Sequence, residues 1–276
     1  MKNVIVSSAA TVLMVITLRI LGLFSLPFRE AIYLGVSILF MVAGCMILKK
    51  MTPKVSSKKF FRCYPVRGAN LVLTVWFTFA VIAGGMLLNL LEVFIWEAVG
   101  ISLPANQLDG LSIENAVLML LFVAVVPAVF EELFFRGAVL SSLQPVGGFV
   151  FSIALSSVLF FIAHGSYYYV LSVLYSGVCF SLLVYMTNSV FSSMAVHFLN
   201  NVLSYLLMIF STRLSHAGFS VFVICGLILI LLMGIYGILS TYEKKLKNDP
   251  SVRVEIFNEG ELVWQRAKRR KKAREK

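Results

Sequence analysis

Two adjacent glutamates and an arginine lie within a long apolar stretch of this 276-residue chain. Between Asn115 and Thr212, Glu131, Glu132 and Arg136 are the only Asp, Glu, Lys or Arg residues. An ionisable side chain at the centre of a bilayer costs about 3 kcal/mol on insertion scales, and such residues mark functional sites by default. We therefore treat these three residues as a candidate site for acid–base chemistry.

The spacing of the three residues separates their expected roles. Glu132 and Arg136 are four apart with the carboxylate first, the order that favours an ion pair on one helix face. Glu131 and Glu132 point about 100° apart around an α-helix, so we expect that they do not both face one site. This leaves Glu131 as the unpaired carboxylate and a candidate general base. Alternatively, all three charges only hold helices together.

Two further polar clusters follow on separate apolar stretches. His164 comes four residues after Phe160, and His197 and Asn201 are four apart on a later stretch. Because residues four apart share a helix face, His197 and Asn201 are expected to direct two N–H donors at one point, as an oxyanion requires. Each cluster also has a plainer interpretation, with His164 as a hydrogen-bonded packing residue and the later pair as a polar clamp between helices.

The elements that position these clusters are expected to be membrane-spanning helices. The chain is 59% hydrophobic and only 13% charged, which a soluble domain could not accommodate. A span needs about 20 mostly apolar residues, and eight stretches qualify, at roughly 4–26, 31–48, 70–96, 114–142, 148–165, 168–187, 189–210 and 219–241. We predict an all-α polytopic transmembrane bundle of about eight helices, with a membrane-embedded domain over 1–243 and a basic tail over 244–276.

Straight antiparallel helices would not bring the clusters to one depth. At about 1.5 Å per residue, Glu131 lies roughly 20 Å and His164 roughly 25–30 Å from a turn expected at 143–147. His197 lies roughly 12 Å from a turn expected at 188. We expect Pro127 to kink its helix and to free a backbone carbonyl near the site, and a kink or tilt must close the difference in depth.

The net charge of +11 is concentrated in the segments 49–67 and 244–276. By the positive-inside rule both segments are cytoplasmic, whereas the loop 97–113, which has no Lys or Arg, lies outside. We therefore expect a multi-pass protein of the cell membrane with both termini in the cytoplasm. The basic tail is interpreted as contacting anionic lipid headgroups, not nucleic acid. Arg19 and Glu92 lie near span ends and are expected to reach the membrane surface.

In order, the polar clusters form the patterns EExxxR, FxxxH and HxxxN. This set resembles the CAAX prenyl protease type 2 and bacteriocin-processing family of intramembrane proteases, also called the CPBP or ABI family. The resemblance covers about residues 114–210, and the matching residues are Glu131, Glu132, Arg136, Phe160, His164, His197 and Asn201. Three patterns in the same order, each on its own span, make the resemblance specific.

The resemblance implies a CAAX-type intramembrane glutamate protease that hydrolyses membrane-associated peptides or precursors with an activated water. It implies Glu131 as the general base and His164 as the residue that positions or polarises the water. It also implies that His197 and Asn201 form an oxyanion hole. Glu132, Arg136 and Phe160 are then the residues that support the site.

No metal or cofactor is expected, because the histidines lie on different spans and the HExxH pattern of a zinc helix is missing. The four cysteines are scattered, with no CxxC pair. A peptide or protein substrate at the membrane is the expected partner.

Two other functions stay open. Bacterial relatives are associated with self-protection against bacteriocins, so a non-catalytic immunity or scaffold protein is the alternative, and it would tolerate replacement of the polar residues. A transporter with a proton relay would be expected to contain repeated halves, and no second half resembles the first.

Overall fold

The computed structural model describes residues 1–23, 29–101, 120–211 and 221–248, and the elements in these ranges are all helical. In chain order they are α1 (Lys2–Leu21), α2 (Arg29–Lys50), α3 (Ser57–Phe60), α4 (Ala69–Ala98), the π-helix η1 (Leu121–Val125), α6 (Val126–Glu131), the π-helix η2 (Glu132–Val139), α7 (Leu140–His164), α8 (Val170–Thr187), α9 (Val190–Ser211) and α10 (Val221–Asn248). The all-α prediction is confirmed.

Where the structure describes them, the predicted spans are helical. Six stretches of the described residues are long and apolar enough to cross a membrane. One of them, Phe122–His164, is 43 residues long and joins two predicted spans. A kink at Gly148, with φ of 77° and ψ of −167°, divides it, and this backbone conformation favours glycine. The seventh predicted span forms α9, which is not among the six, and α10 continues to Asn248, past the predicted start of the tail.

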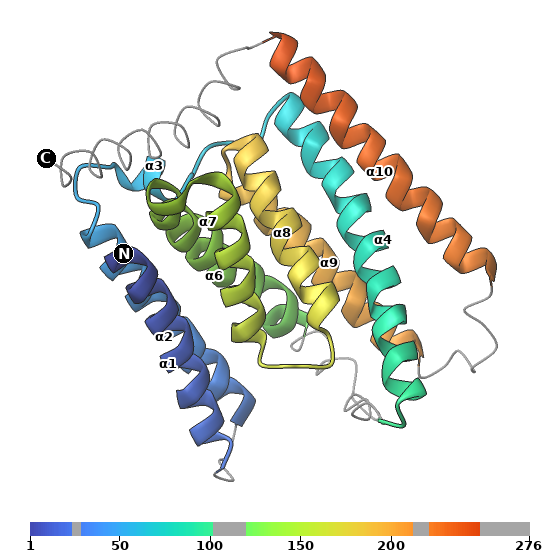
Figure 1. Cartoon of the computed structure of the whole chain (residues 1–276), viewed down its shortest axis with the longest axis horizontal. Coiled ribbons are helices and arrows are strands. Elements are labelled where there is room, and N and C mark those ends of the chain that lie inside the picture. Colours follow the sequence, from blue (N-terminus) through green and yellow to red (C-terminus); the bar gives the residue numbers. More distant parts are fainter. Residues whose placement is uncertain (24–28, 102–119, 212–220, 249–276) are drawn as a thin grey trace, which may run out of the picture.

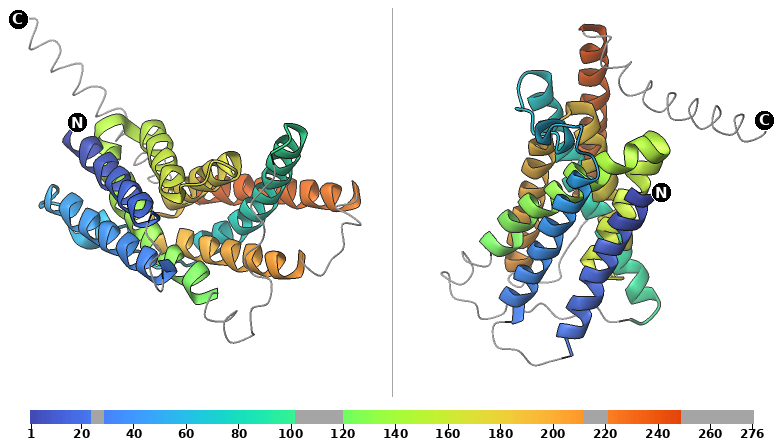
Figure 2. Two further views of the ribbon diagram at one scale, coloured as in Figure 1. Left: turned by 90° about the horizontal axis from the view of Figure 1, so that it is seen from below. Right: turned by 90° about the vertical axis from the view of Figure 1, so that its left-hand side faces the viewer.

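The helices that carry the candidate site lie in the middle of the molecule (Figures 1 and 2). On one side, α1 and α2 pack together, with α1 against α7 and α2 against η2. On the other side, α10 packs on α4, which also contacts α8 and α9. The site helices are thereby held between two flanking helix pairs.

Arg62 ties the loops together at one end of the bundle. Its side chain donates to Ser141 Oγ at 3.2 Å, to Asn188 Oδ1 at 3.5 Å and to Gln144 Oε1. Its backbone carbonyl accepts the Val190 N–H at 3.0 Å. Arg62 therefore joins the loop after α2 to the start of α7 and to the start of α9.

The N-terminus, the loop after α2 and the end of α10 share this end of the molecule (Figure 1). Lys245 on α10 also lies at this end, and its Nζ donates to Asn70 Oδ1 at the start of α4 at 2.8 Å. We propose that this basic end faces the cytoplasm, as the positive-inside rule predicts. The loop 102–119 and the tail beyond Asn248 lie outside the described residues.

Glu92 is buried, with 4% of its surface exposed, so the expectation that it reaches the membrane surface is wrong. Its carboxylate accepts hydrogen bonds from the backbone N–H groups of Leu171 and Ser172 and from Ser172 Oγ, the last at 2.7 Å. These N–H groups belong to the first turn of α8, where they have no intrahelical partner and where the helix dipole favours an anion. Glu92 on α4 thus caps α8.

The loop between α7 and α8 is also held from both sides. Arg19 on α1 donates to the Gly165 carbonyl, and Trp96 Nε1 on α4 donates to the Tyr168 carbonyl at 2.9 Å. These contacts fix the chain that follows His164.

Replacing Glu92 with Ala is expected to destabilise the protein by about 1–2 kcal/mol, because α8 loses its cap. The midpoint of thermal unfolding in detergent measures this change. Glu97→Ala is the matched control, since Glu97 is an exposed acid of the same helix and surface changes usually stay within about 0.5 kcal/mol. Equal unfolding midpoints for the two variants would contradict the capping role.

Candidate active site

A π-helix begins at Glu132 and presents most of the charged cluster to the interior. Its hydrogen bonds run from residue i to i+5, so it has more residues per turn and a smaller angular step than an α-helix, and such segments are frequent at functional sites. Neighbouring helices hold η2 through its backbone carbonyls, because Ser156 Oγ on α7 donates to Phe135 O at 3.0 Å and Cys45 Sγ on α2 lies 3.7 Å from Leu133 O. All of η2 except Leu133 is buried.

The predicted ion pair between Glu132 and Arg136 is confirmed. Arg136 Nη1 donates to Glu132 Oε1 at 2.9 Å, and both side chains are fully buried. Arg136 Nη2 donates to the carbonyl of Gly177 on α8 at 3.2 Å. The guanidinium carbon lies 4.1 Å from the centre of the Phe160 ring and 5.1 Å from that of Phe180, so cation–π contacts add to the pair.

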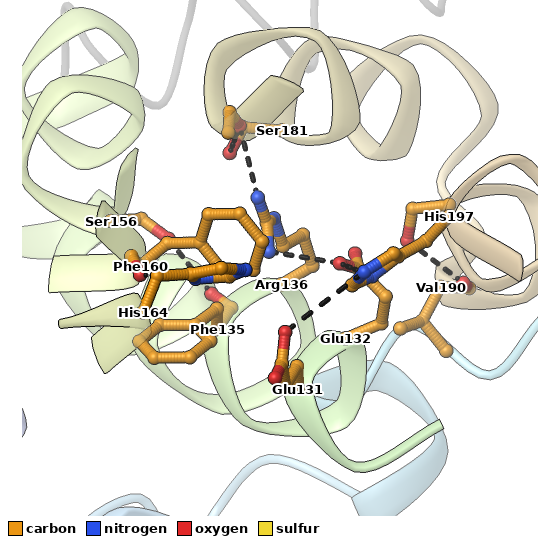
Figure 3. A network of polar contacts seen from close by, with 12 residues as sticks. Glu131, Glu132, Phe135, Arg136, Ser156, Phe160, His164, Ser181, Val190 and His197 are labelled. Atoms are coloured by element: carbon orange, nitrogen blue, oxygen red, sulfur yellow. Dashed lines mark hydrogen bonds and ion pairs between the residues drawn. The ribbon is translucent and has the colours of Figure 1, made fainter. Parts of the chain in front are cut away.

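His197 lies between the two glutamates (Figure 3). Its Nδ1 is 3.0 Å from Glu132 Oε1, and its Nε2 is 4.0 Å from Glu131 Oε2. The ring stacks on Phe180, with centroids 5.0 Å apart and an interplanar angle of 23°. The expectation that the two carboxylates do not face one site is therefore wrong. An imidazole has a nitrogen on each side, so the ring of His197 can approach one glutamate with Nδ1 and the other with Nε2.

Glu131 is the less engaged of the two glutamates. Its side chain is 19% exposed, whereas that of Glu132 is fully buried. The Oε2 atom of Glu131 is itself buried and hydrogen-bonds to no residue that the structure describes. The 4.0 Å to His197 exceeds hydrogen-bond length, so this oxygen keeps its capacity to accept a proton.

Phe160 belongs to this cluster, and His164 lies one helical turn beyond it. The Phe160 ring is 5.9 Å from that of His197 and 4.4 Å from that of His164. His164 Nδ1 lies 2.9 Å from the Phe160 carbonyl, and the histidine lines a cavity of about 530 Å³ together with Arg19 and Tyr33. Its contacts are thus with Phe160, on the side of Arg136 away from His197 (Figure 3).

Asn201 satisfies a carbonyl that Pro127 leaves without its helical partner. Proline has no N–H to give to the carbonyl four residues earlier, which is that of Val123, and Asn201 Nδ2 donates to this oxygen at 3.1 Å. Asn201 thus binds the carbonyl to which Pro127 can give no hydrogen bond. In this arrangement His197 and Asn201 bind different acceptors, Glu132 and the Val123 carbonyl.

Sequence reasoning missed the contribution of α8. Phe180 contacts both His197 and Arg136, and the Gly177 carbonyl accepts from Arg136. A Cβ atom on Gly177 would come within 3.0 Å of the Ser157 side chain, so glycine allows α7 and α8 to approach closely. A small residue in an apolar span is a weak signal of such packing. Phe180 carries no signal at all, because α8 is rich in apolar residues.

A metal site would require several ligands at one point. Within the described ranges, no three His, Cys, Asp or Glu side chains gather in that way.

Comparison with known protein families gives a match over the segment that carries the site. A family model described as Rce1-like, type II CAAX prenyl endopeptidase, matches residues 113–203. No curated protein and no solved structure matches the chain. The matched third of the chain contains every residue of the three sequence patterns, and it supports a CAAX-type intramembrane protease role in general terms. With the apolar helices it also indicates a multi-pass membrane protein. The segment that builds the candidate site thus matches the model of the Rce1-like type II CAAX prenyl endopeptidases, as the three patterns predicted.

Proposed function

We propose that the chain is an intramembrane endopeptidase in which Glu131 activates water to hydrolyse membrane-associated peptides or precursors. One observation carries the proposal. Glu131, His197, Glu132 and Arg136 form a buried polar network, hereafter the glutamate network, inside the segment that matches the protease family.

The charges of the glutamate network suit Glu131 for the role of base. Glu132 is paired with Arg136, so we treat both as ionised, and we assign a proton to Nδ1 of His197 for its hydrogen bond to Glu132. When Glu131 is also ionised, two carboxylates accompany one guanidinium. A second proton on His197, at Nε2, makes the buried network neutral, and buried charges need such pairing.

In the proposed reaction, Glu131 accepts a proton from water as the water oxygen bonds to the scissile carbonyl carbon. The carbonyl oxygen becomes an oxyanion, and the Nε2–H of His197 donates to it once Glu131 is neutral. The carbon–nitrogen bond then breaks, and Glu131 returns its proton to the leaving amine. One water is consumed, and a new carboxyl group and a new amine are formed.

We further propose that His164 orients the water and that Asn201 supplies a second oxyanion donor. When substrate binds, Asn201 would release its hydrogen bond to the Val123 carbonyl and donate to the substrate oxygen instead. Catalytic hydrogen bonds often form fully only with substrate bound. The Phe160 ring contacts both histidines and connects His164 to the glutamate network.

Asn201→Ala tests this second donor. We expect kcat to fall by about 10²–10³-fold, as when an oxyanion-hole donor is removed, together with a stability loss of about 1 kcal/mol for the lost hydrogen bond. Steady-state kinetics and thermal unfolding measure the two effects. Asn200→Ala removes the neighbouring amide as a control. If Asn201→Ala loses stability but keeps its kcat, Asn201 only binds the Val123 carbonyl and is not an oxyanion donor.

The competing function is a non-catalytic bacteriocin immunity or scaffold protein. We would compare the peptides released from membranes that contain the wild-type chain or Glu131→Gln, which keeps the size of the side chain and removes its basicity. Peptides or trimmed termini that vanish in the variant at equal membrane level would support the endopeptidase. Identical peptide profiles, with a cellular effect that persists in both, would support the scaffold and overturn the catalytic proposal.

A further inference from the structure

A groove of about 640 Å³ lies between α2, the loop after it and the helix that carries the glutamates. Its volume is in the range of small-ligand sites, roughly 300–1,000 Å³. Its walls are mostly apolar and include Met41, Val42 and Met46 from α2 and Phe130 and Leu133 from α6 and η2. The groove therefore favours an apolar occupant along most of its length.

Two lysines give the groove a charged end. Lys49 and Lys50 close α2 and belong to the groove lining, and Lys54 follows in the next loop. No acidic side chain is present among the described residues that line the groove. This end of the groove is complementary to an anion.

The order of these residues along α2 orients the occupant. Met41 and Val42 precede Lys49 and Lys50 by about two helical turns, or roughly 12 Å. The lysines end α2, where the loop after α2 begins, at the same end of the molecule as the N-terminus and the end of α10 (Figure 1). The apolar lining residues of α2 lie earlier along this apolar helix. Met46 is 63% exposed, so the groove opens toward the surrounding lipid. An amphiphile with an anionic head and an apolar chain fits this arrangement, and a soluble anion would not use the apolar walls.

We propose that this groove binds one anionic phospholipid, with its phosphate at Lys49 and Lys50 and an acyl chain along Met41 and Leu133. Basic pockets between transmembrane helices are known to bind anionic headgroups in this way. Phe130 and Leu133 flank the two glutamates, so the bound chain packs against the helix that carries the glutamate network. The site is distinct from the basic tail.

The test measures lipid retention, which does not depend on peptidase activity. The purified full chain is reconstituted with equal amounts of phosphatidylglycerol and phosphatidylcholine, extracted in mild detergent and analysed by native mass spectrometry. The wild type is expected to retain one phosphatidylglycerol in preference to phosphatidylcholine. Lys49→Gln/Lys50→Gln is expected to lower this retention by about tenfold or more, given what each lysine near an anionic headgroup contributes.

Lys58→Gln/Lys59→Gln is the matched control, because it removes the same charge from α3, outside the groove, and is expected to retain the lipid. A second variant, Val42→Trp, fills the groove while keeping both lysines, and it too is expected to lose the lipid. The proposal is overturned if both double variants lose lipid equally, if the two lipids are retained equally, or if Val42→Trp binds as the wild type does. A lipid-free dimer that buries the groove would also overturn it.

Discussion

Glu131→Gln is expected to lower kcat by about 10²–10⁴-fold, the usual contribution of a general base. The amide keeps the shape of the side chain, so KM and the thermal unfolding midpoint are expected to change little. The contrast with Glu132 supports this expectation. Glu132 Oε1 already binds Arg136 and His197. The Oε2 atoms of both glutamates make no hydrogen bond among the described residues, but the Glu131 side chain is 19% exposed and that of Glu132 is fully buried. Kinetics on the peptides identified from membranes measure the effect.

Glu97→Gln provides the control for this prediction, because it makes the same chemical change at an exposed position of α4. The general-base role is contradicted if Glu131→Gln and Glu97→Gln have the same kcat. It is also contradicted if the activity of Glu131→Gln falls only in proportion to the amount of folded protein.

Arg136→Ala is expected to destabilise the protein by about 3–5 kcal/mol, the usual cost of leaving one partner of a buried ion pair alone. The loss is large because Glu132 is fully buried and would keep a charge without its guanidinium. The cation–π contacts with Phe160 and Phe180 would also be lost. Thermal or denaturant unfolding in detergent measures the effect.

The double variant Glu132→Leu/Arg136→Met separates structure from function. Apolar residues of similar size often replace a buried ion pair at little cost, so most of the stability lost in Arg136→Ala is expected to return. Activity is not expected to return, because Nδ1 of His197 loses the carboxylate that orients the ring. A double variant that is both stable and fully active would show that the pair only holds the helices together.

The sequence predicted the Glu132–Arg136 pair, because it follows from a local rule of helix geometry. It placed the site helices correctly, since apolar length alone identifies spans. It did not predict that Glu131 and Glu132 both face His197. That outcome depends on where α9 places His197, 65 residues further along the chain, and local helix rules do not give this position.

The turn expected at 143–147 takes another form. The chain stays helical from η2 into α7, and the bend comes at Gly148. The hydrogen bond from Ser156 to Phe135 sets the register between the two arms. Glu92 was misplaced because its partners, the N–H groups of α8, are backbone atoms that no side-chain pattern reveals.

The central claim is that Glu131 activates water for peptide hydrolysis within the membrane-embedded bundle. The most direct measurement uses the purified chain in liposomes with an identified substrate, in water enriched in oxygen-18. For the wild type we predict that each new carboxyl terminus carries one oxygen-18 atom, and for Glu131→Gln that these labelled products are formed at least about 10²-fold more slowly. Labelled products formed by Glu131→Gln at the wild-type rate would contradict the account.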